Sequence, residues 1–325
     1  MRNEADNIAS IVQSLKSQNF PTRNLEIILI DDSSEDQTWD MAQKLITSFD
    51  YFHLIKLENG KRGKKEALKK AIEYAQGHLI VTSDADCILP PNWIKTIVCY
   101  YIRYSPRLIS GPVFMLGRGW FSAFQTIEFM SLTASAAGAI SIKKSTMSNA
   151  ANMAFEKSLY LEFLSSNADQ TTSGDDVFLL HFAKKKYDSK IHFLHSRDAI
   201  VQTYTQSSLS DFFRQRIRWT SKSHKYKDID TILCAVIVLF SNFSLFACII
   251  LSVLQKFSLS WAAVLLLLKA VPDFILLFYA SGFYRCRKLL IGFIPFSILY
   301  IFYIAFVGLL GSFLKFEWKG RKYSR

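Results

Sequence analysis

The amino-acid sequence predicts an α/β domain with a mainly parallel sheet, followed by C-terminal transmembrane helices. Two patterns support this prediction. Apolar segments that end in acidic residues alternate with amphipathic segments through the N-terminal part of the chain, as they do in α/β proteins. Beyond residue 229 the chain is mostly apolar, and its uncharged segments are long enough to cross a bilayer. We therefore expect one domain over residues 1–228 and a membrane domain over residues 229–325.

The N-terminal part alternates between helix-like and strand-like segments. Apolar residues recur at helical spacing in residues 7–18, and residues 25–32 form an apolar run that ends in two carboxylates. The same reasoning predicts helices at 36–48, 66–75 and 92–101 and strands at 52–57 and 78–87. Two of the strands end in acidic pairs, Asp31–Asp32 and Asp84–Asp86. Because ligands bind at the carboxyl ends of parallel strands, these pairs predict the position of a site.

The middle of the chain is less regular. We expect a strand at 108–115, a strand that turns into a helix at 152–160, and helices at 173–187 and 208–222. An aromatic-rich segment, 118–132, predicts another helix. Its composition suits either a core helix or a helix at the membrane interface, and the sequence leaves both interpretations open.

The C-terminal part predicts three membrane spans, near 231–254, 261–280 and 289–314. The first and third contain no charged residue, whereas the second contains Lys269 and Asp273, which are four residues apart and can pair. Lys and Arg outnumber Asp and Glu by ten to three in residues 230–325. Basic residues mark the cytoplasmic side, so we expect residues 1–228 to lie in the cytoplasm beneath the plasma or inner membrane. Three spans place the C-terminus outside, whereas its basic residues favour the cytoplasm, and the sequence leaves this conflict open.

Composition excludes several classes of protein. The net charge is +12, but no basic run is interleaved with aromatic residues on a soluble face, which argues against nucleic-acid binding. The five cysteines are scattered without zinc-ligand spacing, which fits a reducing compartment. Residues 1–16 contain no apolar segment of the kind found in signal peptides.

Asp84 and Asp86 form an Asp-x-Asp element after a predicted strand. Two carboxylates at this spacing can share Mg²⁺ or Mn²⁺, although a solvated turn explains the same three residues. Lys64 lies in the basic loop 59–65 before that strand and could contact phosphates. This loop does not match a Walker A motif.

Two further elements carry candidate site residues. Asp175 and Asp176 open a predicted helix, where a carboxylate is kept ionised and could act as a general base or simply cap the helix. Gln215, Arg218 and Trp219 share one face of a later helix, where an amide, a guanidinium and an indole suit an anionic leaving group beside a ring-shaped acceptor. The same spacing places Arg214 and Arg216 off this face. Both could simply belong to a solvated basic helix near a membrane.

In this order, these elements resemble the family 2 glycosyltransferases, especially the membrane-bound members similar to cellulose and hyaluronan synthases and ceramide glucosyltransferases. The resemblance covers residues 2–222. It rests on the segments RNEADNI, IILIDDSSEDQT, GKKEAL, TSDADC, NAANMAF, SGDD and QRIRW.

The resemblance implies a GT-A fold that binds a nucleotide-sugar donor and transfers the sugar, with inversion, to a lipid, lipid-linked or saccharide acceptor. It also implies a role for each candidate residue. Asp32 would bind the nucleotide base, Lys64 would lie near it and the diphosphate, and Asp84 and Asp86 would hold the metal and diphosphate. Asp176 would be the catalytic base, beside Asp175 where many relatives have Glu. Gln215, Arg218 and Trp219 would match the family's Q-x-x-R-W motif.

One departure concerns the start of the chain. The family's first strand precedes the Arg-Asn-Glu element, whereas here Met1 is followed at once by Arg2, Asn3 and Glu4. We expect the DNA upstream of Met1 to encode, in frame, a short strand rich in Val and Ile, and an in-frame stop codon directly before Met1 would contradict this. Without that strand, the alternative function is a membrane scaffold or regulator that has lost catalysis.

Overall fold

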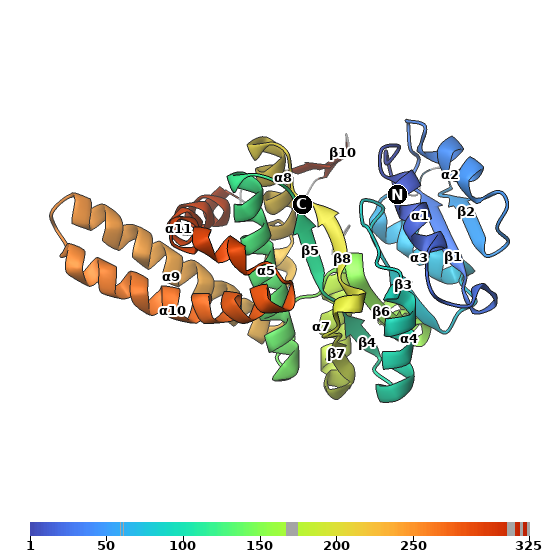
Figure 1. The fold of residues 1–325 in the computed structure, drawn as a ribbon. Helices are drawn as coiled ribbons and strands as arrows, with labels where there is room; N and C mark the ends of the chain where they lie inside the picture. The colour runs from blue at the N-terminus through green and yellow to red at the C-terminus, as the bar shows by residue number, and fades with distance from the viewer. Residues whose placement is uncertain (59, 61, 167–174, 311–315, 319–320, 324–325) are drawn as a thin grey trace. The chain divides into compact units, whose positions relative to one another are not determined.

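The computed structural model describes residues 1–58, 60, 62–166, 175–310, 316–318 and 321–323. The chain divides into two compact units (Figure 1). The first contains residues 1–114 and 136–204, and the second contains residues 115–135 and 205–325. The domain boundary that we expect at residue 228 stays a prediction.

A parallel pair of strands lies in the first unit. Strand β1 (Ile27–Asp31) pairs with β2 (Phe52–Lys56), with Ile27 opposite Phe52. Three helices belong to the same part of the chain: α1 (Ile8–Lys16), α2 (Thr38–Ile46) and α3 (Lys64–Tyr74). The apolar residues that predicted α1 form its buried face, so the sequence periodicity and the packing agree.

A second sheet in this unit has four strands in the order β3–β6–β4–β7. Their bounds are Leu79–Thr82 for β3, Met153–Glu156 for β6, Leu108–Ser110 for β4 and Ile191–Phe193 for β7. Strand β6 is antiparallel to both of its neighbours, whereas β4 and β7 are parallel. The α/β class is confirmed, but this sheet is mixed, whereas the sequence predicted a mainly parallel one.

The strand predicted at 108–115 is broken into β4 and β5 (Val113–Leu116). Between them, Pro112 has no N–H to donate to a sheet, and the backbone of Gly111 lies against Asn152: a Cβ on Gly111 would be 2.4 Å from that side chain. Strand β8 (Val201–Tyr204) pairs with β5. The short strands β7 and β8 were missed by the sequence analysis because three or four residues carry too little periodicity.

The core of the first unit is packed around β4 and β6. Helices α4 (Trp93–Tyr104), α6 (Lys157–Ser165) and α7 (Asp175–Tyr187) complete this unit. The large side chains of Phe155, Tyr160 and Phe163 are fully buried in the cluster beneath the four-stranded sheet. This burial anchors β4, β6 and β7, and Ile80 of β3 packs against the same cluster.

The second unit is mainly helical in its described part, which also holds the end of β5 and the short strands β9 (Phe316–Trp318) and β10 (Arg321–Tyr323). Its helices are α5 (Trp120–Ser141, shared with the first unit), α8 (Leu209–Thr220), α9 (Ile229–Val253), α10 (Leu259–Phe283) and α11 (Phe293–Leu310). Helices α9 and α10 lie side by side as a hairpin (Figure 1). Helix α5 corresponds to the helix predicted at 118–132 and extends nine residues beyond its predicted end.

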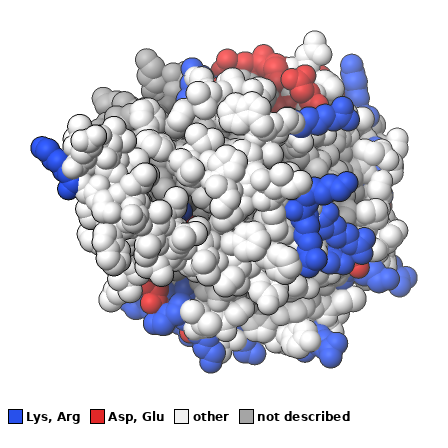
Figure 2. All heavy atoms as spheres, turned by 60° about the vertical axis from the view of Figure 1, so that its left-hand side comes forward, with Lys and Arg blue, Asp and Glu red and all other residues white. Residues whose placement is uncertain are grey.

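Three helical segments are long and apolar enough to cross a membrane: 229–253, 259–283 and 287–308. They match the three predicted spans. Figure 2 is turned so that the side of Figure 1 that carries α9 and α10 comes forward, and it shows a broad face of uncharged side chains there. Within the second segment, Lys269 Nζ and Asp273 Oδ2 lie 2.9 Å apart, as predicted, and Lys269 also lies over the Tyr300 ring. The Lys269 side chain is 15% exposed and that of Asp273 is 43% exposed, so the lysine is the better covered of the two.

Candidate active site

The residue after β1, Asp32, is buried at the end of the strand with 3% of its surface exposed. Its Oδ2 accepts a hydrogen bond from the backbone N–H of Gly63 at 3.1 Å. Gly63 has a φ of 99°, a conformation that glycine adopts at little cost. This turn brings the start of α3, and therefore Lys64, to the end of β1.

Lys64 donates a hydrogen bond to Oδ1 of Asp84. Both side chains keep contact with solvent, because Lys64 is 47% exposed and Asp84 is 38% exposed. An ion pair this accessible contributes little to stability. Lys64 and Asp84 can therefore separate and each bind a group of a ligand instead.

Asp86 lies near Asp84 and remains exposed to solvent. Crowding by surrounding protein atoms raises the pKa of Asp86, and the negative charges of Asp84 and Glu4 raise it further. A bound cation would relieve this repulsion, so the two carboxylates fit the divalent ion expected from the sequence. Within the described residues, no group of three His, Cys, Asp or Glu side chains could hold a metal. The remaining ligands would come from a diphosphate and water.

Asp176 is attached to the end of β3 through two hydrogen bonds in series. Its Oδ2 accepts from the backbone N–H of Ala150 at 3.3 Å, and the carbonyl of Ala150 accepts from Oγ1 of Thr82 at 2.8 Å. Thr82 ends β3 and precedes Asp84 by two residues. The structure thus joins Asp32, Lys64, Asp84 and Asp176 into one region of the first unit. The Asp175 side chain lies outside the described part of the chain.

The other predicted site residues, Gln215, Arg218 and Trp219, are on α8 in the second unit and are half-buried. One expectation for this helix is wrong. Arg216 was expected to lie off the face of Gln215, Arg218 and Trp219, as in a solvated basic helix, but it is only 2% exposed and contacts two of these residues. Its guanidinium donates to Oε1 of Gln215 and lies 4.3 Å from the centroid of the Trp219 ring. Arg214 is 70% exposed, as expected.

The partner of Arg216 was missed by the sequence analysis. Glu128 of α5 is buried and accepts from Nε of Arg216 at 3.2 Å and from Nη2 at 2.5 Å. Tyr303 of α11 donates to the same carboxylate at 3.3 Å. The available signal was a lone acidic residue inside an apolar, aromatic-rich segment, because such a charge needs a partner when it is buried.

Asn152 was quoted in the sequence analysis only as part of a longer segment, yet it joins three parts of the first unit. Its side chain accepts from the indole of Trp93 and donates to the carbonyls of Pro112 and Ala199, at 2.9, 2.8 and 2.8 Å. The asparagine is buried with every side-chain hydrogen bonded. It therefore holds together α4, the connection between β4 and β5, and the segment before β8.

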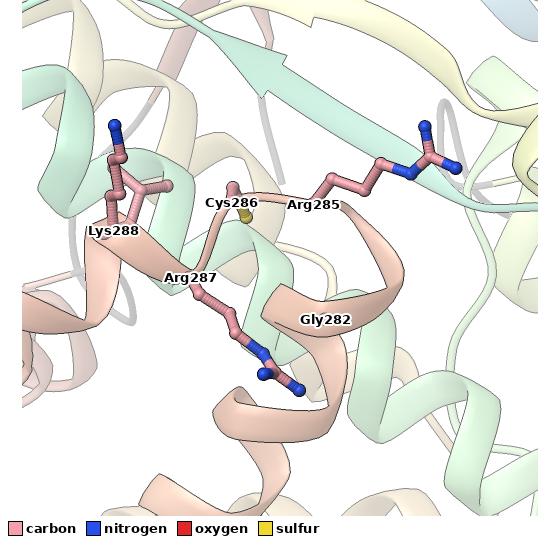
Figure 3. Close-up of a pocket in the computed structure, with 6 residues that line it drawn as sticks. Gly282, Arg285, Cys286, Arg287 and Lys288 are labelled. Atoms are coloured by element: carbon pink, nitrogen blue, oxygen red, sulfur yellow. The ribbon is translucent and has the colours of Figure 1, made fainter.

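A pocket of about 430 Å³ lies between α10 and α11. Three cations line it, Arg285, Arg287 and Lys288, together with Gly282, Cys286 and Leu289. Figure 3 shows that the three cationic side chains leave the backbone in different directions. They do not converge on one point, and none of the predicted site residues lines this pocket.

The profile of the family described as glycosyl transferase family 2 matches residues 1–165. The chain belongs to this family. The match covers the loop after β1, the Asp-x-Asp element and Ala150, which are the parts joined by the hydrogen bonds above. The expected glycosyltransferase class is thus confirmed at the level of the family.

Individual relatives are more distant. The chain is 25% identical over 199 residues to glycosyltransferase AglE of Haloferax volcanii, covering 61% of this chain and 62% of that protein. It is 26% identical over 238 residues to a poly-β-1,6-N-acetyl-D-glucosamine synthase of Staphylococcus aureus, covering 69% of this chain and 53% of the synthase. The chain thus spans less than two thirds of the length of either relative.

The fold also matches a solved structure, the mannosyltransferase PcManGT of Pyrobaculum calidifontis in complex with GDP-Man and Mn²⁺. The TM-score is 0.54 and the sequence identity is 16%, and the match covers 94% of this chain and 85% of that chain. This likeness confirms the GT-A-like α/β fold.

Proposed function

We propose that the protein transfers a sugar, with inversion, from a nucleotide-sugar donor to a lipid, lipid-linked or polysaccharide acceptor at a membrane. The observation that carries this proposal is the hydrogen-bonded series from Asp32 through Gly63 and Lys64 to Asp84. It joins a buried carboxylate suited to a nucleoside with a cation and carboxylates suited to a diphosphate. Family membership and the membrane-length helices support the same function.

The donor would lie along this series. Asp32 would accept a hydrogen bond from the base, and Lys64 would move from Asp84 to the diphosphate. Asp84 and Asp86 would hold Mg²⁺ or Mn²⁺, which when bound neutralises the diphosphate charge. The solved neighbour in complex with GDP-Man and Mn²⁺ supports this choice of ligands.

The reaction would be a single displacement. Asp176 would take the proton from an acceptor hydroxyl, whose oxygen attacks the anomeric carbon of the sugar. The bond from that carbon to the diphosphate breaks, and its electron pair leaves with the nucleoside diphosphate. Arg218 would stabilise the leaving group, and Gln215 and Trp219 would bind the acceptor sugar. Attack opposite the leaving group inverts the anomeric centre.

The acceptor class is proposed from two observations. Three helices are long and apolar enough to cross a membrane, which supports an acceptor at the lipid surface, and the staphylococcal relative is named for a polysaccharide product. We also propose that the catalytic residues face the cytoplasm, since Arg285, Arg287 and Lys288 lie at the turn that joins the second and third segments.

A donor screen tests the function. Membranes that contain the protein are incubated with single nucleotide sugars, with and without lipid extracts, and the release of nucleoside diphosphate is measured. We expect release with one donor, increased by an acceptor and abolished by EDTA. The absence of release and of labelled product with every donor would favour the alternative, a membrane scaffold.

A further inference from the structure

Glu128 and Arg216 form a closed ion pair inside the second unit. Their side chains are 4% and 2% exposed, and Arg216 uses all three guanidinium nitrogens as donors, two toward Glu128 and one toward Gln215. A buried ion pair commonly adds little net stability compared with apolar residues of similar volume. Its presence therefore calls for a role other than stability.

The contacts of Arg216 indicate that role. A guanidinium can only donate, so its bond to Oε1 of Gln215 fixes which atom of the amide faces inward. The amide NH₂ of Gln215 is left on the other side. The same guanidinium lies on the Trp219 ring, which also contacts Phe129 of α5 at 5.9 Å between centroids. One buried cation thus orients two of the three motif residues on α8.

The pair also reaches a membrane helix. Tyr303 of α11 donates to Glu128, and its ring packs against Phe212 of α8 at 5.4 Å between centroids. Glu128 therefore connects α5, α8 and a segment long enough to cross a membrane.

We propose that Glu128 and Arg216 are positioning residues for sugar transfer, which hold Gln215 and Trp219 in one orientation on α8 and are linked to α11 through Tyr303. The inference rests on the proposed function, because the motif residues matter only if transfer occurs. It predicts that the charged pair is needed for turnover even where it is not needed for folding.

Turnover and stability are compared in three variants of the full chain. Glu128→Gln is expected to lower kcat about 10²-fold, as misplaced reacting groups do, with little change in the KM for the donor. Glu128→Leu combined with Arg216→Met should regain the parental melting temperature, since apolar replacement of a buried pair is often neutral, but should keep the low kcat. The matched control is Arg214→Gln, which removes an exposed cation from the same helix and should retain parental kcat. A paired variant with parental kcat would overturn the proposal.

A second measurement does not depend on transfer. The protein is labelled with 5-fluorotryptophan, and the Trp219 resonance is assigned with Trp219→Phe. One sharp resonance is expected in the parent and a shifted or broadened one in the paired variant. An unchanged resonance would overturn the proposal even if no donor were accepted, whereas a failed donor screen with a shifted resonance would count against the proposed function alone.

Discussion

Two ion pairs of this protein differ in what surrounds them. Lys64 and Asp84, in the first unit, are 47% and 38% exposed, whereas Arg216 and Glu128, in the second, are 2% and 4% exposed. Water screens the first pair, so each member can leave the other for a ligand at little cost. The second pair has no such freedom, because a buried charge without its partner is strongly unfavourable. Accessible charges suit ligand exchange, and enclosed charges suit fixed geometry.

The largest effect is expected when the enclosed pair is broken from one side. Arg216→Ala leaves the Glu128 carboxylate buried with Tyr303 as a donor, and should cost about 3–5 kcal/mol of stability. Thermal unfolding in detergent measures the loss. Lys64→Ala, which breaks the accessible pair, is the control and should cost about 0–1 kcal/mol. Equal losses in the two variants would remove the distinction between the pairs.

The next effect concerns Asp176, whose carboxylate is linked by hydrogen bonds through Ala150 to the end of β3. Asp176→Asn retains the shape of the side chain but removes the proton acceptor, so transfer should fall by about 10²-fold or more. Donor affinity should stay near the parental value, because Asp176 is not proposed to contact the donor. Binding of a nucleotide sugar and turnover are measured on the same preparation. Parental turnover would move the base assignment to Asp175.

A smaller effect is expected when the accessible pair loses its cation. Lys64→Met should weaken binding of the nucleoside diphosphate by about tenfold, the value of one charge-assisted hydrogen bond, while the melting temperature hardly changes. Isothermal titration with the nucleoside diphosphate and Mn²⁺ measures the affinity. Lys70→Met provides the control. Lys70 lies on the same helix α3 and pairs with Glu58 at 2.9 Å. Equal affinities of the two variants would contradict the role of Lys64.

The smallest effect is a shift in pH dependence. Asp86 must be ionised to hold a cation, and its pKa is raised above the ordinary value by surrounding protein, Asp84 and Glu4. Metal-dependent donor binding should therefore weaken on acidification at a higher pH than for an ordinary aspartate. Glu4→Gln removes one of the negative charges, so the pKa of Asp86 should fall and the loss of binding should move to lower pH. An unchanged pH profile of donor affinity would show that Glu4 does not act on Asp86.

The raised pKa of Asp86 also makes the stability of the folded protein depend on pH. Because the pKa of Asp86 is raised on folding, its ionised form is less favourable in the folded protein than in the unfolded chain. The ionised carboxylate therefore lowers the stability of the folded protein at pH values above the pKa of Asp86. This loss disappears as the pH falls through that pKa. A residue that binds a ligand at the expense of stability fits a functional position.

Several features followed from the sequence alone. Helical spacing predicted α1 and α8, long apolar runs predicted three membrane-length segments, and acids after apolar runs predicted where the candidate site lies. These features are local: a period of 3.6 or a run of apolar residues is set by neighbours along the chain. The positions of Asp32, Asp84 and Asp86 at strand ends could be predicted for the same reason.

Only the tertiary structure decided what those residues contact. Arg214 and Arg216 are two positions apart on one helix and look alike in sequence, yet one is exposed and the other is buried. The difference arises from Glu128, which lies 88 residues away along the chain and whose partner no local pattern can identify. Likewise, Gly63 reaches Asp32 across 31 residues, and β6 enters the sheet antiparallel. Packing selects such partners, because a buried charge or N–H must be satisfied by whichever group the fold brings to it.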